Sequence, residues 1–134
     1  MPSVFHWTVR VYYEDTDAGG IVFYANYLKF FERARTEWLR AAQVGQHDLL
    51  QEHGAIFVVR RTSVDYHAPA RLDDELRLTL QIEKLGSASV QFLQQAWRGD
   101  TLLTSAAVKV GCVDAASLRP RALPAHVAAR MRAV

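Results

Sequence analysis

Three carboxylates stand close together near the N-terminus, where Glu14, Asp15 and Asp17 precede the consecutive glycines Gly19 and Gly20. Such a cluster is either a solvated acidic turn or the source of one carboxylate that acts as a nucleophile or general base. The apolar residues that follow it could desolvate such a carboxylate and raise its basicity. The two glycines would let a substrate approach the backbone closely. This arrangement suits chemistry on a polarised carbonyl.

Other catalytic arrangements find no support in the sequence. The five histidines show no metal-ligand spacing, and Cys112 is the single cysteine, so neither a metal site nor an internal disulfide is expected. No serine stands in a G-x-S-x-G context, and the glycine pair has neither the dinucleotide nor the phosphate-loop spacing. The strand pattern around Cys112 indicates a buried small side chain rather than a nucleophile.

Two elements must position the acidic cluster. Apolar and polar residues alternate over residues 4–14, which predicts a strand that ends at the cluster. From about Ala25 the apolar residues recur every three or four positions, which predicts a helix of four or five turns that packs on one side. Asn26 could cap its start, or residues 20–25 could hold the first turn, and Gly45 is the expected stop. The free N–H groups of the helix start would then lie beside the carboxylates, where they could stabilise an oxyanion.

The remainder of the chain predicts a sheet. Strand-like segments cover residues 56–66, 76–83, 89–98 and 102–113, and short helices are expected at 47–53 and 125–131. Gly99 and Asp100 fit a hairpin turn between the last two strands. With 134 residues, 50% of them hydrophobic, the chain is expected to form a single domain over residues 1–134. One long helix against a curved, largely antiparallel sheet is a two-layer α+β fold.

Composition argues against several classes of protein. Sixteen Lys and Arg against fourteen Asp and Glu give a net charge of +2, which is too small to indicate a nucleic-acid partner. No run of eighteen apolar residues predicts a membrane span, and the N-terminal residues have no signal-peptide pattern, which favours a cytoplasmic protein. Basic residues scattered through the strand region form either a solvated face or contacts to the phosphates of a large anionic cofactor: Arg60, Arg61, Arg71, Lys84 and Arg98.

The segment VYYEDTDAGGIVFYANYLKFFERARTEWLR, residues 11–40, resembles the signature of the 4-hydroxybenzoyl-CoA thioesterase family. It is most similar to the YbgC-type branch, the small acyl-CoA thioesterases associated with the Tol-Pal system. The positions that carry the resemblance are Tyr12, Glu14, Asp15, Asp17, Gly20, Val22, Asn26, Tyr27, Glu32 and Arg35. A weaker match is SVDYHAPARLDDELRL, residues 63–78, which resembles the family's strand, Pro-containing turn and acidic strand start.

The resemblance implies a hotdog fold, in which the antiparallel sheet wraps the long helix. It also implies a homo-oligomer, either a dimer paired through its sheets or a homotetramer, with sites at the subunit interface. The implied reaction is hydrolysis of an acyl-CoA thioester to free acid and coenzyme A, without a metal or other cofactor. The family's catalytic carboxylate falls on Asp17, and the backbone amide that polarises the thioester carbonyl falls on Tyr24. Gly20, Val22 and Tyr27 are the expected substrate-binding positions.

Several alternatives are compatible with the same residues. Asp15 competes with Asp17 for the catalytic role, although Asp15 and Glu14 suit hydrogen bonds within the turn. Hydratases and dehydratases of acyl thioesters share the fold but usually need a histidine base near the helix, and none lies between His6 and His47. A third possibility is a non-catalytic module that binds acyl-CoA or a protein.

The helix itself carries two further ambiguities. Glu32 and Arg35 lie three residues apart and are expected to pair with each other or to orient the loop. Four aromatic side chains would either line an acyl pocket or belong to the core: Tyr24, Tyr27, Phe31 and Phe57.

Overall fold

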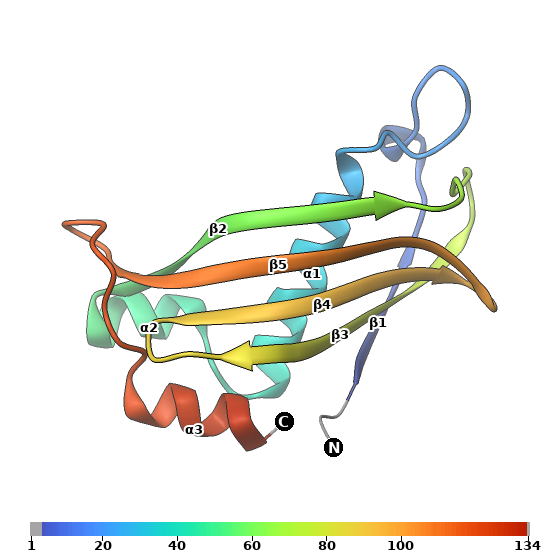
Figure 1. Cartoon of the computed structure of the whole chain (residues 1–134). Coiled ribbons are helices and arrows are strands. Elements are labelled where there is room, and N and C mark those ends of the chain that lie inside the picture. The colour runs from blue at the N-terminus through green and yellow to red at the C-terminus, as the bar shows by residue number, and fades with distance from the viewer. Residues whose placement is uncertain (1–3, 134) are drawn as a thin grey trace.

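The computed structural model describes residues 4–133, and their centre is a five-stranded antiparallel sheet (Figure 1). The strands lie in the order β1-β3-β4-β5-β2. Their bounds are Phe5–Arg10 for β1, Ala55–Tyr66 for β2, Glu75–Leu85 for β3, Ser89–Arg98 for β4 and Thr101–Asp114 for β5. The strands β1 and β2 are therefore the two edges of the sheet, and within the chain each pairs on one side only.

The long helix α1, Asn26–Ala41, lies across one face of this sheet (Figure 1). Its buried stripe includes Phe30, Phe31, Ala34 and Trp38, at the spacing that predicted a helix packed on one side. Trp38 packs edge-on against Phe92 of β4, with ring centroids 5.4 Å apart. This two-layer α+β arrangement is the hotdog fold that the motif resemblance implied.

The first strand is shorter than its alternation predicted. β1 ends at Arg10, and Tyr13–Asp15 forms one turn of 3₁₀ helix, in which Tyr13 is 82% exposed. The cause is local, because the Asp15 carboxylate accepts the Tyr12 N–H at 2.8 Å and the Asp15 N–H bonds to the Tyr12 carbonyl at 3.0 Å. These two bonds close the turn and stop the strand.

The long helix also ends before its expected stop. Its last residue is Ala41, and Gln43 then takes a left-handed backbone conformation (φ 61°) that turns the chain away. Gly45 instead precedes the short helix α2, Gln46–His53. Gly54 (φ 61°) closes α2, as the sequence predicted.

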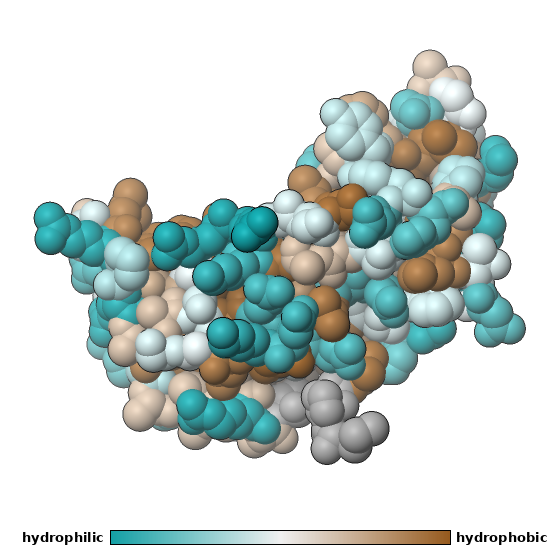
Figure 2. All heavy atoms as spheres, in the orientation of Figure 1, coloured by the Kyte–Doolittle hydropathy of each residue, from teal (hydrophilic) through white to brown (hydrophobic). Residues whose placement is uncertain are grey.

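The two ends of the molecule are built differently. At one end α2 lies beside the last helix, α3 (Ala125–Ala133), where the rings of His53 and His126 are 4.9 Å apart. At the other end, the loop of residues 11–25 and the start of α1 lie near the end of β2 (Figure 1). Figure 2 shows hydrophilic side chains gathered over the sheet face turned away from α1. Within residues 4–133, no helix is long and apolar enough to cross a membrane.

Candidate active site

The loop between β1 and α1 folds into a small hairpin. Thr16 pairs with Val22 in antiparallel register, and the Asp17 N–H donates to the Ile21 carbonyl at 2.9 Å. The Gly20 N–H bonds to the Asp17 carbonyl at 3.0 Å, which closes the tip. Gly20 has a φ of 79°, a backbone conformation that residues with a Cβ rarely adopt, so this turn needs glycine.

Asp15 holds this hairpin against the start of α1. It is only 7% exposed, and its carboxylate is engaged by the Tyr12 N–H. Its carbonyl accepts the Phe23 N–H at 2.9 Å and the Asn26 side-chain amide at 2.8 Å. The prediction that Asp15 hydrogen-bonds the turn is confirmed, whereas Glu14 is exposed.

Asp17 is exposed at the surface of the same hairpin. Its Oδ1 atom accepts the Gly19 N–H at 2.8 Å. The expected desolvation by residues 21–23 does not occur within one chain, because Val22 is buried in the core and Phe23 is itself exposed. Asp17 is not among the residues that line the four best-formed cavities within residues 4–133. Its carboxylate is therefore open to solvent in the single chain.

The start of α1 offers unused backbone donors beside this hairpin. The Asn26 N–H bonds to the Phe23 carbonyl at 2.8 Å, and the Leu28 N–H bonds to the Ala25 carbonyl at 3.1 Å. In the described part of the chain, the N–H groups of Tyr24 and Ala25 donate no hydrogen bond. Tyr24 is 63% exposed. These free N–H groups lie at the positive end of the helix dipole, which favours a developing negative charge.

A cavity of about 260 Å³ opens next to this helix start, and we call it the mouth cavity. Its lining residues are Ile21, Val22, Tyr24, Tyr27, Tyr66, His67, Ala68 and Pro69. Three of its aromatic rings form a cluster, in which the Tyr66 ring lies 6.2 Å from that of Tyr24 and 5.7 Å from that of Tyr27. The mouth cavity thus joins the hairpin, the helix start and the end of β2.

Tyr66 and His67 are residues of this site that the sequence analysis did not single out, although both lie in the weaker family match over residues 63–78. The Tyr66 hydroxyl donates to the Tyr24 carbonyl at 2.9 Å. His67 Nε2 lies 2.9 Å from the Ser105 hydroxyl. Sequence separation suggested that no histidine lies near the helix start, yet His67 lines the same cavity. One sequence signal could have indicated Tyr66 and His67, because both lie at the end of the strand predicted over residues 56–66.

The expected substrate-binding positions occupy different places. Val22 and Tyr27 line the mouth cavity from its buried side, and the Tyr27 hydroxyl accepts the Ala70 N–H at 3.2 Å. Burial raises the pKa of Tyr27, against the opposing effect of the Ala70 N–H, so the hydroxyl stays protonated. Gly20 lies outside the cavity at the hairpin tip, where a Cβ would meet open space.

The turn between β2 and β3 is hydrogen-bonded to the part of the hairpin that lines the mouth cavity. The Val22 N–H donates to the Ala70 carbonyl at 2.9 Å, and Ile21 pairs with Arg71. Residues 21–22 are thus hydrogen-bonded to two segments at once, the Asp17 side of the hairpin and this turn. The result is a fixed wall for the cavity.

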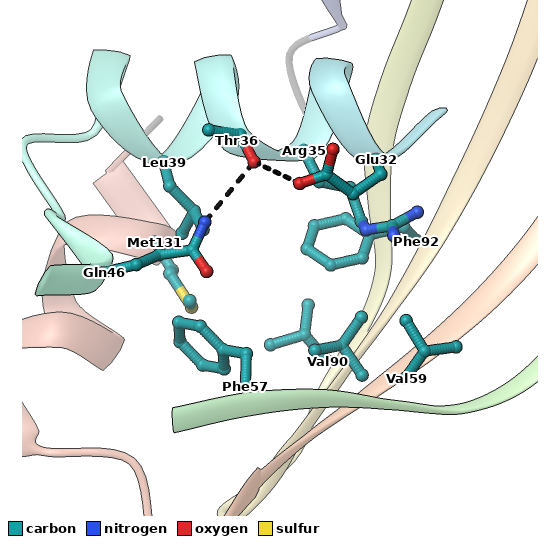
Figure 3. A pocket seen from close by; sticks show the side chains of 11 residues that line it. Glu32, Arg35, Thr36, Leu39, Gln46, Phe57, Val59, Val90, Phe92 and Met131 are labelled. Atoms are coloured by element: carbon teal, nitrogen blue, oxygen red, sulfur yellow. Dashed lines mark hydrogen bonds between the residues drawn. The ribbon is translucent and has the colours of Figure 1, made fainter. Parts of the chain in front are cut away.

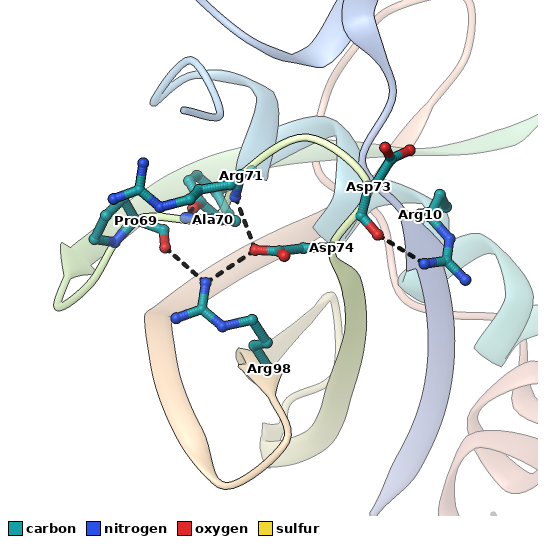
Figure 4. A network of polar contacts seen from close by, with 8 residues as sticks. Arg10, Pro69, Ala70, Arg71, Asp73, Asp74 and Arg98 are labelled. Atoms are coloured by element: carbon teal, nitrogen blue, oxygen red, sulfur yellow. Dashed lines mark hydrogen bonds and ion pairs between the residues drawn. The ribbon is translucent and has the colours of Figure 1, made fainter. Parts of the chain in front are cut away.

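An ion pair holds that turn in place (Figure 4). Asp74 accepts the Arg71 N–H at 2.8 Å and the Arg98 guanidinium at 2.9 Å, and Arg98 also donates to the Pro69 carbonyl at 3.1 Å. Burial by itself would raise the pKa of Asp74, but these hydrogen bonds and the arginine charges together lower it. Arg98 is therefore engaged within the protein, whereas the Arg71 side chain next to the mouth cavity is exposed.

A second cavity, the inner cavity of about 140 Å³, lies between α1 and the first half of β2 (Figure 3). Its walls are mostly apolar, and its polar residues come from α1 and the start of α2. The lining residues are Glu32, Arg35, Thr36, Leu39, Gln46, Phe57, Val59, Val90, Phe92, Val110 and Met131. Phe57 lines this cavity, whereas Phe31 is a fully buried core residue.

Glu32 and Arg35, the two helix charges beside the inner cavity, were expected to pair with each other, but each bonds to another side chain. Arg35 donates to the side-chain oxygen of Gln94 at 2.9 Å, and the fully buried Gln94 amide donates in turn to the Phe31 carbonyl at 2.9 Å. Glu32 instead accepts the Thr36 hydroxyl at 2.8 Å. Burial lowers the pKa of Arg35, and the nearby Glu32 charge opposes that shift. Arg35 thus links α1 to the middle of the sheet.

Other chemistry-bearing groups are dispersed. Cys112 is buried, as its strand pattern predicted. Across the residues that the structure describes, no three His, Cys, Asp or Glu side chains are grouped so that they could hold a metal ion.

The fold and the site together describe a hotdog domain with a carboxylate-bearing hairpin at the start of its central helix. Residues 19–105 match the family model described as Thioesterase superfamily. That match runs from the glycine pair through α1 and into β5. The chain therefore belongs to the thioesterase superfamily.

Individual relatives narrow the assignment. The chain is 48% identical to the acyl-CoA thioester hydrolase YbgC of Escherichia coli O157:H7 over 131 residues, which are 97% of each protein. It is 46% identical to the acyl-CoA thioesterase YbgC of Haemophilus influenzae, over 93% of this chain and 92% of that protein. A crystal structure of a probable thioesterase from Bartonella henselae superimposes with a TM-score of 0.85 and 32% identity, over 91% of this chain and 100% of that one. Within the superfamily, the chain belongs to the YbgC-type branch that its motif resembled.

Proposed function

We propose that this protein hydrolyses acyl-CoA thioesters to a free acid and coenzyme A, with Asp17 as the catalytic carboxylate and the Tyr24 N–H as the donor to the thioester carbonyl. One observation carries the proposal. The hairpin that leads into α1 exposes the Asp17 carboxylate, and the Tyr24 N–H at the start of that helix has no acceptor among the described residues. The similarity to YbgC acyl-CoA thioesterases supports the same class of reaction.

Two routes are open to these groups. As a nucleophile, Asp17 attacks the thioester carbon, the C–S bond breaks and coenzyme A leaves as a thiolate. The mixed anhydride formed in this step is then hydrolysed by water to the acid and the free Asp17 carboxylate. As a general base, Asp17 takes a proton from the water that attacks the same carbon, and the C–S bond then breaks to release the coenzyme A thiolate and the acid. In both routes negative charge develops on the carbonyl oxygen, and an amide donor there is worth about 2.7–4 kcal/mol.

The substrate would enter through the mouth cavity. In this proposal Val22 and Tyr27 form its buried wall, and the open space over Gly20 admits part of the substrate close to the backbone. The exposed Arg71 lies beside Ile21 at the same rim, where it could meet an anionic group of coenzyme A.

The proposal includes a homo-oligomer, either a dimer or a homotetramer, in which residues 1–134 act as a single hotdog domain. The edge strand β2 has a free side within the chain and exposes Val59 by 53%. The Asp17 carboxylate is open to solvent in the single chain. A second subunit that covered the hairpin would remove water from this carboxylate, which one chain alone does not do. Light scattering tests the assembly, and cell fractionation tests the cytoplasmic location that we expect.

The reaction class is tested by thiol release from acetyl-, butyryl-, decanoyl- and benzoyl-CoA. We expect many turnovers per subunit on at least one of them. Stoichiometric binding without thiol release would instead indicate a binding module. Loss of the double bond of crotonyl-CoA without thiol release would indicate a hydratase, and His67 in the mouth cavity would then be its candidate base.

A further inference from the structure

A side chain binds the backbone just before α1, at Tyr24, which precedes the N-cap residue Ala25. The Leu28 N–H, in the first turn, bonds to the carbonyl of the N-cap residue Ala25 at 3.1 Å, so the helix makes no use of the Tyr24 carbonyl. The Tyr24 carbonyl accepts the Tyr66 hydroxyl at 2.9 Å. A side chain from the end of an edge strand therefore holds the backbone at the start of the central helix.

That contact fixes one of two successive peptide planes. The plane between Phe23 and Tyr24 is held within the loop, because the Phe23 carbonyl accepts the Asn26 N–H at 2.8 Å. The plane between Tyr24 and Ala25 is held by the Tyr66 hydroxyl. Both planes carry an N–H that donates no hydrogen bond among the described residues, that of Tyr24 and that of Ala25. The Tyr24 N–H, which the proposed function uses, and the neighbouring Ala25 N–H are thus oriented by two different contacts.

The position of Tyr66 suits this role. It is the last residue of β2 and pairs with Thr104 of β5, so the sheet fixes its backbone. Its ring packs nearly edge-on against Tyr24, with 86° between the ring planes, and also packs against Tyr27. The strand pairing and these two ring contacts therefore keep the hydroxyl at the Tyr24 carbonyl.

We propose that Tyr66 is a positioning residue of the thioesterase reaction, whose hydroxyl orients the Tyr24–Ala25 peptide so that the amide donors at the start of α1 meet the thioester carbonyl. The inference rests on the proposed function. Tyr66 acts through the backbone and exchanges no proton with the substrate. Because it ends β2, it also links the orientation of these donors to the edge of the sheet.

The variant Tyr66→Phe removes one hydroxyl and keeps the ring. We expect kcat to fall about 10- to 100-fold, because a small misplacement of catalytic donors has effects of that size. KM, the binding of coenzyme A and the thermal midpoint are expected to stay close to wild type. The matched control is Tyr13→Phe, which removes the hydroxyl of a tyrosine that is 82% exposed and lies outside the mouth cavity. A wild-type kcat in Tyr66→Phe would overturn the proposal, and so would an equal fall in both variants.

A spectroscopic measurement separates positioning from a general loss of structure. In an Asp17→Asn background, the acyl-CoA that the wild type hydrolyses fastest, labelled with ¹³C at its carbonyl, is bound and its C=O stretch is measured by infrared difference spectroscopy. Donation by the helix amides would lower the stretching frequency relative to the free thioester. In the double variant Asp17→Asn/Tyr66→Phe, we expect a clearly smaller shift, because the Ala25 N–H loses its orientation while the Tyr24 N–H keeps its own, and the ligand still binds.

The outcomes distinguish the two claims. The same shift with and without the Tyr66 hydroxyl would overturn the positioning role and leave the proposed function intact. An absence of any shift in Asp17→Asn alone would overturn the role of the helix amides in the proposed function, and the inference about Tyr66 with it.

Discussion

The hydrogen bond between Arg35 and Gln94 joins the central helix to the middle of the sheet, and its removal should have a measurable cost. Gln94 is fully buried, and leucine has a similar volume, so Gln94→Leu leaves little cavity. The Phe31 carbonyl, which lies inside α1, keeps its helical partner. The partly buried guanidinium of Arg35, however, loses the acceptor that lies 2.9 Å away.

A hydrogen bond to a charged group contributes about 1.5–3 kcal/mol, so we expect Gln94→Leu to lower the free energy of unfolding by about 2 kcal/mol. For a domain of this size that corresponds to a thermal midpoint roughly 6–10 °C lower. Urea unfolding at a fixed protein concentration measures the change, and the fixed concentration keeps any subunit association comparable.

The double variant Arg35→Met/Gln94→Leu supplies the internal check. Once both polar partners are replaced by apolar ones, no charge is left without an acceptor, so the pair should cost clearly less than the sum of the two single variants. We expect a coupling energy of about 2 kcal/mol between the two positions. Additive single effects, or a cost below about 0.5 kcal/mol for Gln94→Leu, would refute the role given to this contact.

Three further predictions concern the hairpin and its supporting turn. Gly20→Ala should cost about 1–2 kcal/mol because the position has a φ of 79°, although its Cβ would meet no atom within 4 Å; thermal unfolding measures this. Gly19→Ala should instead lower kcat, since its Cβ would lie 3.2 Å from the Asp17 Oδ1 atom, while the thermal midpoint changes less than in Gly20→Ala. Burial would raise the pKa of Asp74, but its hydrogen bonds and the nearby arginine charges outweigh burial and lower that pKa. The ionised carboxylate therefore stabilises the fold at pH values above the unfolded pKa of about 4. Asp74→Asn should therefore be destabilising at neutral pH, with a difference from wild type that shrinks as the pH falls from about 4 through the lowered pKa. Asp73→Asn is the control, and a pH-independent difference for Asp74→Asn would contradict the assignment.

Local patterns in the sequence predicted most of the fold. The stripe of Phe30, Ala34 and Trp38 predicted α1, and the Gly99-Asp100 pair predicted the last hairpin, because both signals lie within a few neighbouring residues. The error at the end of β1 came from a side chain that competes with the pattern. Asp15 stops β1 by bonding its own turn, and no hydrophobic periodicity contains that information.

The candidate site was predicted only where its residues are contiguous. The motif over residues 11–40 pointed to the hairpin and the helix start, but Tyr66 and His67 reach the mouth cavity through the pairing of β2 with β5. Arg35 and Gln94 are 59 residues apart, so their contact is likewise a product of the tertiary fold. One sequence gives no direct signal for such long-range pairs.

The central claim is that the Asp17 carboxylate acts on the thioester carbon. Its most direct test is the steady-state rate of thiol release by Asp17→Asn at saturating acyl-CoA, in a protein whose thermal midpoint and coenzyme A binding match the wild type. A missing general base or nucleophile predicts a kcat at least about 100-fold lower than wild type. An Asp17→Asn protein that releases thiol at the wild-type rate would contradict the account.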